Sequence, residues 1–351
     1  MSGIPLLGIE TTSKHTLMDF TVKRYSQLLH SLLTQGFSFL SVSAYIRLIP
    51  NFQSEIANLQ SEIPKAPSSL PHAFVILRHD VDARPQNSLR LARLEHTLGI
   101  QGTYYFRIPH TFQPSIIQEI ASLGHEIGYH YETLATIAKE GTWRRRDEGT
   151  KRRRNEETER RRDGEMRGRR DEGTKRRREE GMRGRRDERT ERRRDEGTKR
   201  MKSAYELFVE NLCKFREIVP VTTICMHGSP LSRYDNREIW QKYDYRDLGI
   251  TGDAYLDIDF NRVAYFTDTG RRWNGAEVSI RDKVSGPFQF NLKTTEELIR
   301  AIPQFPDQVM ITVHPQRWND AFLPWAGELL LQNAKNIIKR ILVKTSAFNR
   351  T

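Results

Sequence analysis

Apolar positions recur at helical spacing in several separate stretches of the chain. Residues 21–36 place Tyr25, Leu28, Leu29, Leu32 and Leu33 on one helical face, and the stretch stops at Gly36. Spacing of three and four residues predicts an amphipathic helix with one buried face. The same period predicts further helices at 87–99, 114–124, 203–215, near 237–243, at 294–302 and at 325–343. Ser203 with Glu206, and Thr294 with Glu297, have the spacing of a capping box, which predicts that a helix starts at each pair.

Short runs of apolar and β-branched residues separate these helices. Residues 72–80, HAFVILRHD, are apolar at consecutive positions, which is typical of a strand covered on both faces. Further strands are predicted at 102–108, 125–130, 221–226, 262–267 and 309–313. Strands that alternate with helices of this length predict an α/β fold with a parallel sheet, either closed as a barrel or open.

A charged repeat in residues 144–200 interrupts the alternation. An Asp, Asn or Glu recurs every eight residues, at Asp147, Asn155, Asp163, Asp171, Glu179, Asp187 and Asp195. Because the repeat has no apolar stripe to bury, we expect a low-complexity insert that is disordered or forms a single salt-bridged helix. The predicted organisation is an N-terminal extension (1–17), one domain formed by 18–143 and 201–345, and the insert.

The basic character of the chain is a local property of this insert. Residues 144–200 contain 26 Lys and Arg against 16 Asp and Glu, so they carry +10 of the net charge of +12. The charge therefore does not predict a specific nucleic-acid partner, although weak contact of the repeat with RNA or another polyanion stays open. Two cysteines, no apolar run of about 18 residues and no signal peptide predict a cytoplasmic protein without a transmembrane segment.

Polar clusters follow four of the predicted strands, at residues 78–82, 125–130, 227–230 and 314–318. The carboxyl ends of parallel strands meet at one edge of a sheet or barrel, which is where such folds build their sites. Carboxylates and imidazoles gathered there are ligands for a catalytic divalent metal ion, which takes about three protein ligands and keeps one position open.

Asp80 and Asp82 are the first candidates for this chemistry. Side chains alternate along a strand, so the two carboxylates point to the same side. One can bind a metal ion while the other accepts a proton from the water that the metal activates. The alternative is that both residues cap the helix that begins near Pro85. His125 is expected to be structural, and His130 is equally compatible with a ligand and with a structural role.

A second polar string contains Asp268, Arg271 and Trp273. An Asp–Arg pair could orient the catalytic base, and the indole could form a wall on which a sugar stacks. The alternative is a surface turn, because Asp-Thr-Gly is common in turns. The same two interpretations apply to the pair formed by Arg317 and Trp318.

Five motifs in order along the chain resemble those of polysaccharide deacetylases, the NodB-homology or carbohydrate esterase 4 family. They are LRHDVD (77–82), GTYYF (102–106), GHEIGYH (124–130), HGSP (227–230) and TVHPQRW (312–318). The resemblance implies a distorted, TIM-like (β/α) barrel of about seven parallel strands. It also implies hydrolysis of amide C–N bonds, with removal of acetyl groups from N-acetylated sugars.

The resemblance assigns a role to individual residues. Asp80 would be the general base, Asp82 a metal ligand, His130 a second ligand, and His314 the general acid that protonates the leaving amine. The cofactor would be a divalent metal ion, with zinc first and cobalt or manganese as alternatives. In a cytoplasmic setting, a soluble nucleotide-linked or lipid-linked sugar is the expected substrate.

The chain departs from the family pattern at Leu134, where the family has a further histidine four residues after His130. His227 is the first candidate to complete the ligand set and Glu132 the second; otherwise metal binding is weakened or lost. The arginine that opens the third motif of the family is not evident in CMHGSP, residues 225–230. The alternative function is therefore a carbohydrate-binding barrel without catalytic activity.

Overall fold

The computed structural model describes residues 18–49, 71–141, 177–229, 232–273 and 284–348, without the side chains of 177–193 and 338–348. The predicted N-terminal extension and the part of the predicted insert up to residue 176 lie outside these ranges. Two compact units make up the chain, Met1–Ile127 with Asp257–Thr351, and Gly128–Leu256.

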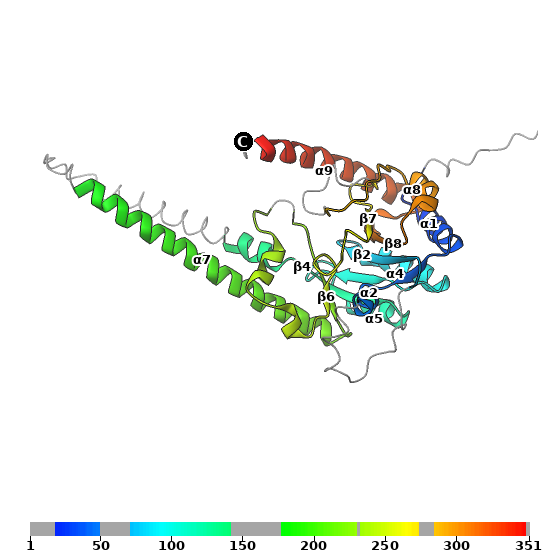
Figure 1. The fold of residues 1–351 in the computed structure, drawn as a ribbon, viewed down its shortest axis with the longest axis horizontal. Helices are drawn as coiled ribbons and strands as arrows, with labels where there is room; N and C mark the ends of the chain where they lie inside the picture. Colours follow the sequence, from blue (N-terminus) through cyan, green and yellow to red (C-terminus); the bar gives the residue numbers. More distant parts are fainter. Residues whose placement is uncertain (1–17, 50–70, 142–176, 230–231, 274–283, 349–351) are drawn as a thin grey trace, which may run out of the picture. The chain divides into compact units, whose positions relative to one another are not determined.

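Strands and helices alternate along the chain (Figure 1). The strands are β1 (Ser38–Leu40), β2 (Phe74–Val81), β3 (Thr103–Phe106), β4 (Glu126–Tyr131), β5 (Thr223–Met226), β6 (Gly252–Asp253), β7 (Ala264–Thr267) and β8 (Gln308–Val313). The longer helices are α1 (Val22–Thr34), α2 (Val42–Leu48), α4 (Pro85–Thr97), α5 (Pro114–Ser122), α7 (Arg177–Arg216), α8 (Thr295–Ala301) and α9 (Phe322–Phe348). Short 3₁₀ turns are η2 (Asn236–Gln241), η3 (Tyr245–Leu248), η5 (Ile302–Gln304) and η6 (Pro315–Arg317).

Strand pairing within each unit is parallel. In the first unit β2 pairs with β1 and with β3, and also with β8, which pairs with β7. In the second unit β5 pairs with β4 and with β6. The predicted fold class is confirmed: the chain has an α/β fold with a curled sheet of parallel strands flanked by helices, consistent with a distorted barrel.

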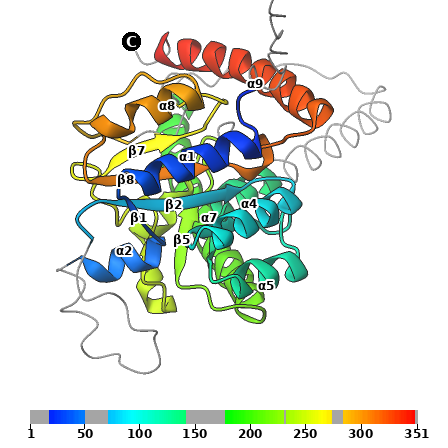
Figure 2. The same ribbon diagram turned by 90° about the vertical axis from the view of Figure 1, so that its right-hand side faces the viewer.

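The first unit has a hydrophobic core between its helices and its strands. Figure 2 shows α1 and α8 side by side over β7 and β8. The buried face of α1 contains Tyr25, Leu28, Leu29 and Leu32, as predicted, but Leu33 is 38% exposed and does not belong to it. All eight residues of β2 are buried, which agrees with a strand covered on both faces.

Two helix starts were predicted from capping boxes, and one prediction is wrong. The box of Thr294 and Glu297 opens α8 as expected. Ser203 and Glu206 open no helix, because α7 begins at Arg177 and runs through both positions. The spacing was read as a start because the charged residues before it gave no helical signal of their own. The helix predicted near 237–243 is the shorter turn η2.

Among the residues that the structure describes, no helix combines the length and the apolar character needed to cross a membrane.

Candidate active site

The carboxylate of Asp80 is held by a neighbour on the same strand. Nε of Arg78 donates to Oδ1 of Asp80 at 2.8 Å, and Nη2 donates to Oδ2 at 2.6 Å. Both side chains are buried at the end of β2. A bidentate pair of this kind fixes the carboxylate plane and stabilises its ionised form. Asp80 therefore has a fixed position and keeps its negative charge.

Asp82 follows β2 directly, and its backbone N–H donates to the carbonyl of Asp80 at 3.1 Å. Its Oδ1 lies 3.7 Å from Nη1 of Arg107, and its Oδ2 lies 3.9 Å from Nε2 of His314. The interpretation of the two aspartates as helix caps is wrong, because α4 begins after Arg84 without any side-chain cap. Neither carboxylate therefore serves as the cap of α4.

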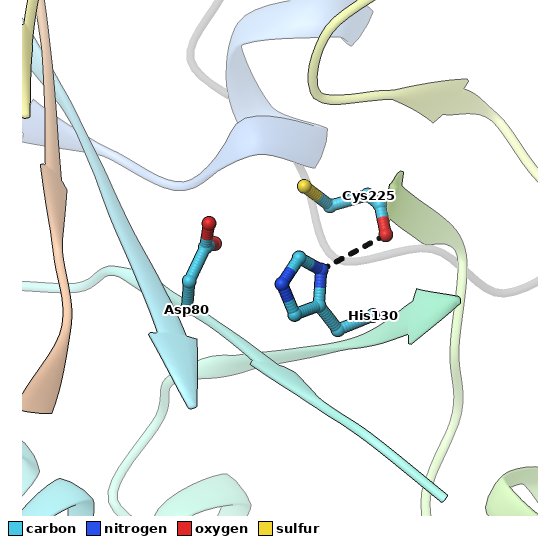
Figure 3. Close-up of side chains that lie close together, drawn as sticks. All are labelled: Asp80, His130 and Cys225. Carbon is cyan, nitrogen blue, oxygen red and sulfur yellow. Dashed lines mark hydrogen bonds between the residues drawn. The ribbon is translucent and has the colours of Figure 1, made fainter. Parts of the chain in front are cut away.

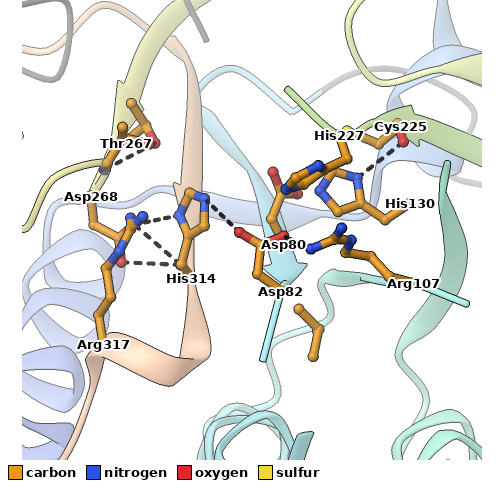
Figure 4. Close-up of polar contacts among 12 residues, drawn as sticks. Asp80, Asp82, Arg107, His130, Cys225, His227, Thr267, Asp268, His314 and Arg317 are labelled. Carbon is orange, nitrogen blue, oxygen red and sulfur yellow. Dashed lines mark hydrogen bonds and ion pairs between the residues drawn. The ribbon is translucent and has the colours of Figure 1, made fainter. Parts of the chain in front are cut away.

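Asp268 and His314 form a buried pair that the sequence did not connect (Figure 4). Oδ1 of Asp268 lies 2.6 Å from Nδ1 of His314, whose backbone N–H also donates to the carboxylate. Arg317 Nη1 donates to Oδ1 at 2.5 Å, and Trp318 Nε1 donates to Oδ2 at 2.8 Å. These donors to the carboxylate of Asp268 thus all come from one short segment after β8, residues 314–318.

Burial of Asp268 would raise its pKa, but the charges of Arg317 and His314 and the hydrogen bonds from His314 outweigh this effect and lower the pKa. An ionised carboxylate can only accept, so Nδ1 of His314 carries a proton. The other nitrogen, Nε2, then gains or releases the exchangeable proton, and it is the nitrogen that faces Asp82. The arrangement suits proton transfer by His314.

The remaining residues of the two polar strings are buried near the pair of Asp268 and His314. Arg271 donates through Nη1 to the carbonyl of Arg317 at 3.1 Å. The indole of Trp273 is buried and donates to Oγ1 of Thr295 at 3.2 Å, and the indole of Trp318 is completely buried. A buried ring offers no face to a sugar, so neither indole fits the predicted stacking wall. The surface-turn alternative does not fit either, because these residues are buried.

His130 lies in the second unit, near the end of β4. Its Nδ1 lies 3.0 Å from the carbonyl oxygen of Cys225, a contact drawn in Figure 3. A carbonyl oxygen can only accept, so Nδ1 is protonated and the lone pair of the neutral ring is on Nε2. This is the orientation that metal-binding histidines adopt.

His227 lies after β5, the strand that pairs with β4. Its ring centre is 5.2 Å from that of His130, and the planes are nearly perpendicular. Nδ1 of His227 lies 3.2 Å from Oε1 of Glu132, which also accepts from Oγ of Ser229 at 2.5 Å. The backbone N–H of Ser229 also donates to Nδ1 of His227, at the longer distance of 3.4 Å. The nearer carboxylate favours a proton on Nδ1, and in that tautomer Nε2 is the basic nitrogen. Glu132, the second candidate for a ligand, thus lies behind the imidazole of His227.

Two further positions have structural roles. Leu134 is buried and offers no ligand atom. Nε2 of His125 lies 2.9 Å from the carbonyl of Ala92, and its Nδ1 accepts from the backbone N–H of Gly102 at 3.2 Å. Burial lowers the pKa of His125 and outweighs the opposing charge of Glu95. His125 is therefore a neutral, hydrogen-bonded core residue, in agreement with the structural role that we expected.

Among the residues that the structure describes, two groups of side chains have the residue types to hold a metal ion, and within each group the ligand atoms lie within 4.8 Å of one another. One group is Asp80, His130 and Cys225; the other is Asp82, His130 and His227. The first fits a cation less well, because both oxygens of Asp80 already accept from a guanidinium. The second has the mixed imidazole and carboxylate character of catalytic zinc sites. It contains the three residues that we expected as ligands.

Comparisons with protein-family models, with curated proteins and with solved structures found no match. The deacetylase resemblance therefore rests on the five motifs alone.

Sequence reasoning missed two arginines. Arg78 is two residues before Asp80, so the alternation that places Asp80 and Asp82 on one side of β2 places Arg78 there too. That signal was present in the sequence. Arg107 follows β3, and its approach to Asp82 comes from the pairing of β2 with β3, which no local pattern shows.

Proposed function

We propose that this chain is a metal-dependent hydrolase of non-peptide amide bonds that removes acetyl groups from N-acetylated sugars. One observation carries the proposal. His314 is oriented by the buried Asp268 and faces Asp82, a residue of the metal-compatible group Asp82, His130 and His227.

The ligands in this proposal are Oδ of Asp82 and Nε2 of each imidazole, with zinc as the first choice and cobalt or manganese as alternatives. Three protein ligands leave a position for water and substrate. A bound divalent ion would lower the pKa of a water molecule and polarise the substrate carbonyl. Glu132 and the carbonyl of Cys225 hold the imidazoles in their ligand orientation.

Asp80 acts in this proposal as the general base. Arg78 donates to both oxygens of its carboxylate. The guanidinium orients Asp80 and favours its ionised form before the reaction, so that Asp80 can then accept a proton from the water. His314 then donates a proton from Nε2 to the leaving amine, because Asp268 retains the proton on Nδ1. The roles match those that the motif resemblance implies.

The test is a screen for acetate release from N-acetylated sugars, including nucleotide-linked and lipid-linked ones, with Zn²⁺, Co²⁺ or Mn²⁺ added. The cytoplasmic setting predicted from the sequence favours such precursors as substrates. Wild type should release acetate, whereas Asp80→Asn and His314→Gln should each lose at least about a hundredfold in rate. Asp307→Asn, which alters an exposed carboxylate, is the matched control. No release by a metal-loaded protein would overturn the proposal.

A barrel that binds carbohydrate without catalysis is the second candidate, and the burial of Leu134 favours it. In that case sugar binding would persist in the Asp80→Asn variant and would not depend on added metal. Calorimetric titration of both proteins with the same sugars separates the two functions.

A further inference from the structure

The C-terminal helix α9 turns a polar side toward the body of the first unit. Glu328, Gln332 and Asn336, four residues apart, are each buried. Nδ2 of Asn336 donates to the carbonyl of Gly270 at 3.0 Å, and Oδ1 of Asn336 accepts from Nε2 of Gln332 at 2.8 Å. The buried side of this helix is thus held by hydrogen bonds rather than by apolar packing.

The first turn of α9 is held in the same way. Trp325 Nε1 donates to the carbonyl of Asp19 at 2.5 Å. The guanidinium of Arg271 lies 5.3 Å from the centre of the same indole. These contacts fix the rotation of the helix about its own axis, so its opposite side is determined.

That opposite side is apolar and exposed. Leu323, Leu330 and Ile337 are spaced by seven residues, which places them on one side of the helix, and they are 80%, 71% and 58% exposed. Phe322 and Leu331 are also mostly exposed. Large exposed apolar surfaces on a folded unit mark sites of interaction with another molecule or with a membrane.

The charged residues of α9 indicate what kind of partner can cover its exposed apolar side. Within α9 the acidic side chain is Glu328, which is buried, and the basic residues are Lys335, Lys339, Arg340 and Lys344. All four basic residues are in the second half. A second copy of the helix in parallel pairing would bring like charges together, and in antiparallel pairing it would offer them no exposed acidic partner. An anionic surface is complementary to them.

We propose that α9 lies on an anionic membrane surface, with Leu323, Leu330 and Ile337 in the acyl boundary, and that the net positive charge of the helix sequence draws it to anionic lipid. An apolar side combined with Lys and Arg is the composition of helices that lie in the membrane interface. The helix does not need to span the bilayer, which agrees with its low overall apolar character. This surface is independent of the proposed hydrolase site.

Co-sedimentation of the full chain with lipid vesicles tests the proposal. Wild type should bind vesicles of phosphatidylcholine with about 30% phosphatidylserine, and binding should fall with added salt or without phosphatidylserine. The triple variant Leu323→Gln, Leu330→Gln, Ile337→Gln should bind at least about tenfold less. Leu33→Gln, at an exposed leucine of α1, is the matched control and should bind like wild type.

Circular dichroism confirms that the variants are folded, and sedimentation velocity reports self-association. Three results would overturn the proposal: no binding of wild type to the anionic vesicles, equal binding by the triple variant, or a dimer that the triple variant abolishes in a protein that ignores vesicles.

Discussion

Nδ1 of His314 lies 2.6 Å from the carboxylate of Asp268, and both side chains are buried. Two segments that are 46 residues apart thus form one acid–base unit, because β7 and β8 are paired and end at the same edge. The pair decides which nitrogen of His314 exchanges protons, so the chemistry of His314 depends on a residue that does not itself need to touch substrate.

Replacing Asp268 by Asn should reduce both activity and stability. The amide cannot balance the charge of Arg317, and it no longer forces the proton onto Nδ1 of His314. We expect kcat to fall at least about a hundredfold with a changed pH profile, and the free energy of unfolding to fall by about 3 kcal/mol. Urea unfolding and kinetics measure the two effects. An Asp268→Asn variant with unchanged kcat would contradict the role of the pair.

The buried carboxylate of Glu95 should make the free energy of unfolding depend on pH. It is fully buried, accepts from Tyr25 and Tyr104, and lies 2.9 Å from Nε2 of His79. Burial would raise the pKa of Glu95, but the charge of His79 and the hydrogen bonds from His79 and Tyr25 outweigh burial and lower this pKa from its ordinary value of 4.5. The ionised group therefore contributes stability above pH 4.5, which is lost as the pH falls toward the pKa of the folded state.

The measurement is urea unfolding of wild type and Glu95→Gln between about pH 6 and pH 3.5. Near pH 6 wild type should have a larger free energy of unfolding than Glu95→Gln. The difference between the two proteins should shrink as the pH falls below about 4.5. Glu296→Gln, at a partly exposed carboxylate, should show a small and nearly constant difference. A constant difference for Glu95→Gln would show that its charge does not contribute.

Glu132 should affect metal affinity without being a ligand. Its carboxylate lies beside Nδ1 of His227, and partners of this kind typically change affinity by about 10- to 100-fold. Glu132→Gln should therefore weaken metal binding by about tenfold or more in chelator competition. Ser229→Ala removes only the hydroxyl that donates to Glu132, and its effect should be smaller. Equal affinity in Glu132→Gln and wild type would remove Glu132 from the site.

Leu134→His tests whether the family's ligand position is retained. Leu134 is buried, so an imidazole there loses apolar packing and has no polar partner designed for it. We expect about 1 to 3 kcal/mol of lost stability and no gain in metal affinity. Tighter metal binding by this variant would place a ligand position at residue 134 and contradict the assignment to His227.

Much of the fold could be predicted because each element carries its own pattern. The apolar run of β2 and the capping box of Thr294 and Glu297 are local signals, and both were read correctly. The start of α7 was predicted wrongly, because the charged residues from Arg177 onward show no apolar period. Leu33 was placed in the core because spacing alone cannot locate the edge of a buried face.

For the candidate site too, relationships within one strand could be predicted from the sequence, and contacts between distant segments could not. Asp80 and Asp82 are adjacent in sequence, so alternation along one strand was enough to pair them. The contact of Asp268 with His314 depends on strand pairing across 46 residues, which no local pattern encodes. The burial of Trp273 and Trp318 likewise depends on what packs over them, so their predicted sugar-stacking role could not be judged from composition.

Metal content of the purified full chain tests the central claim most directly. After dialysis against Zn²⁺ and then against buffer, elemental analysis of wild type should give about one equivalent of zinc per chain. Asp82→Asn and His130→Gln should each lose it, whereas Asp307→Asn, with its exposed carboxylate, should keep it. Less than about a tenth of an equivalent in wild type, or full occupancy in Asp82→Asn, would contradict the account.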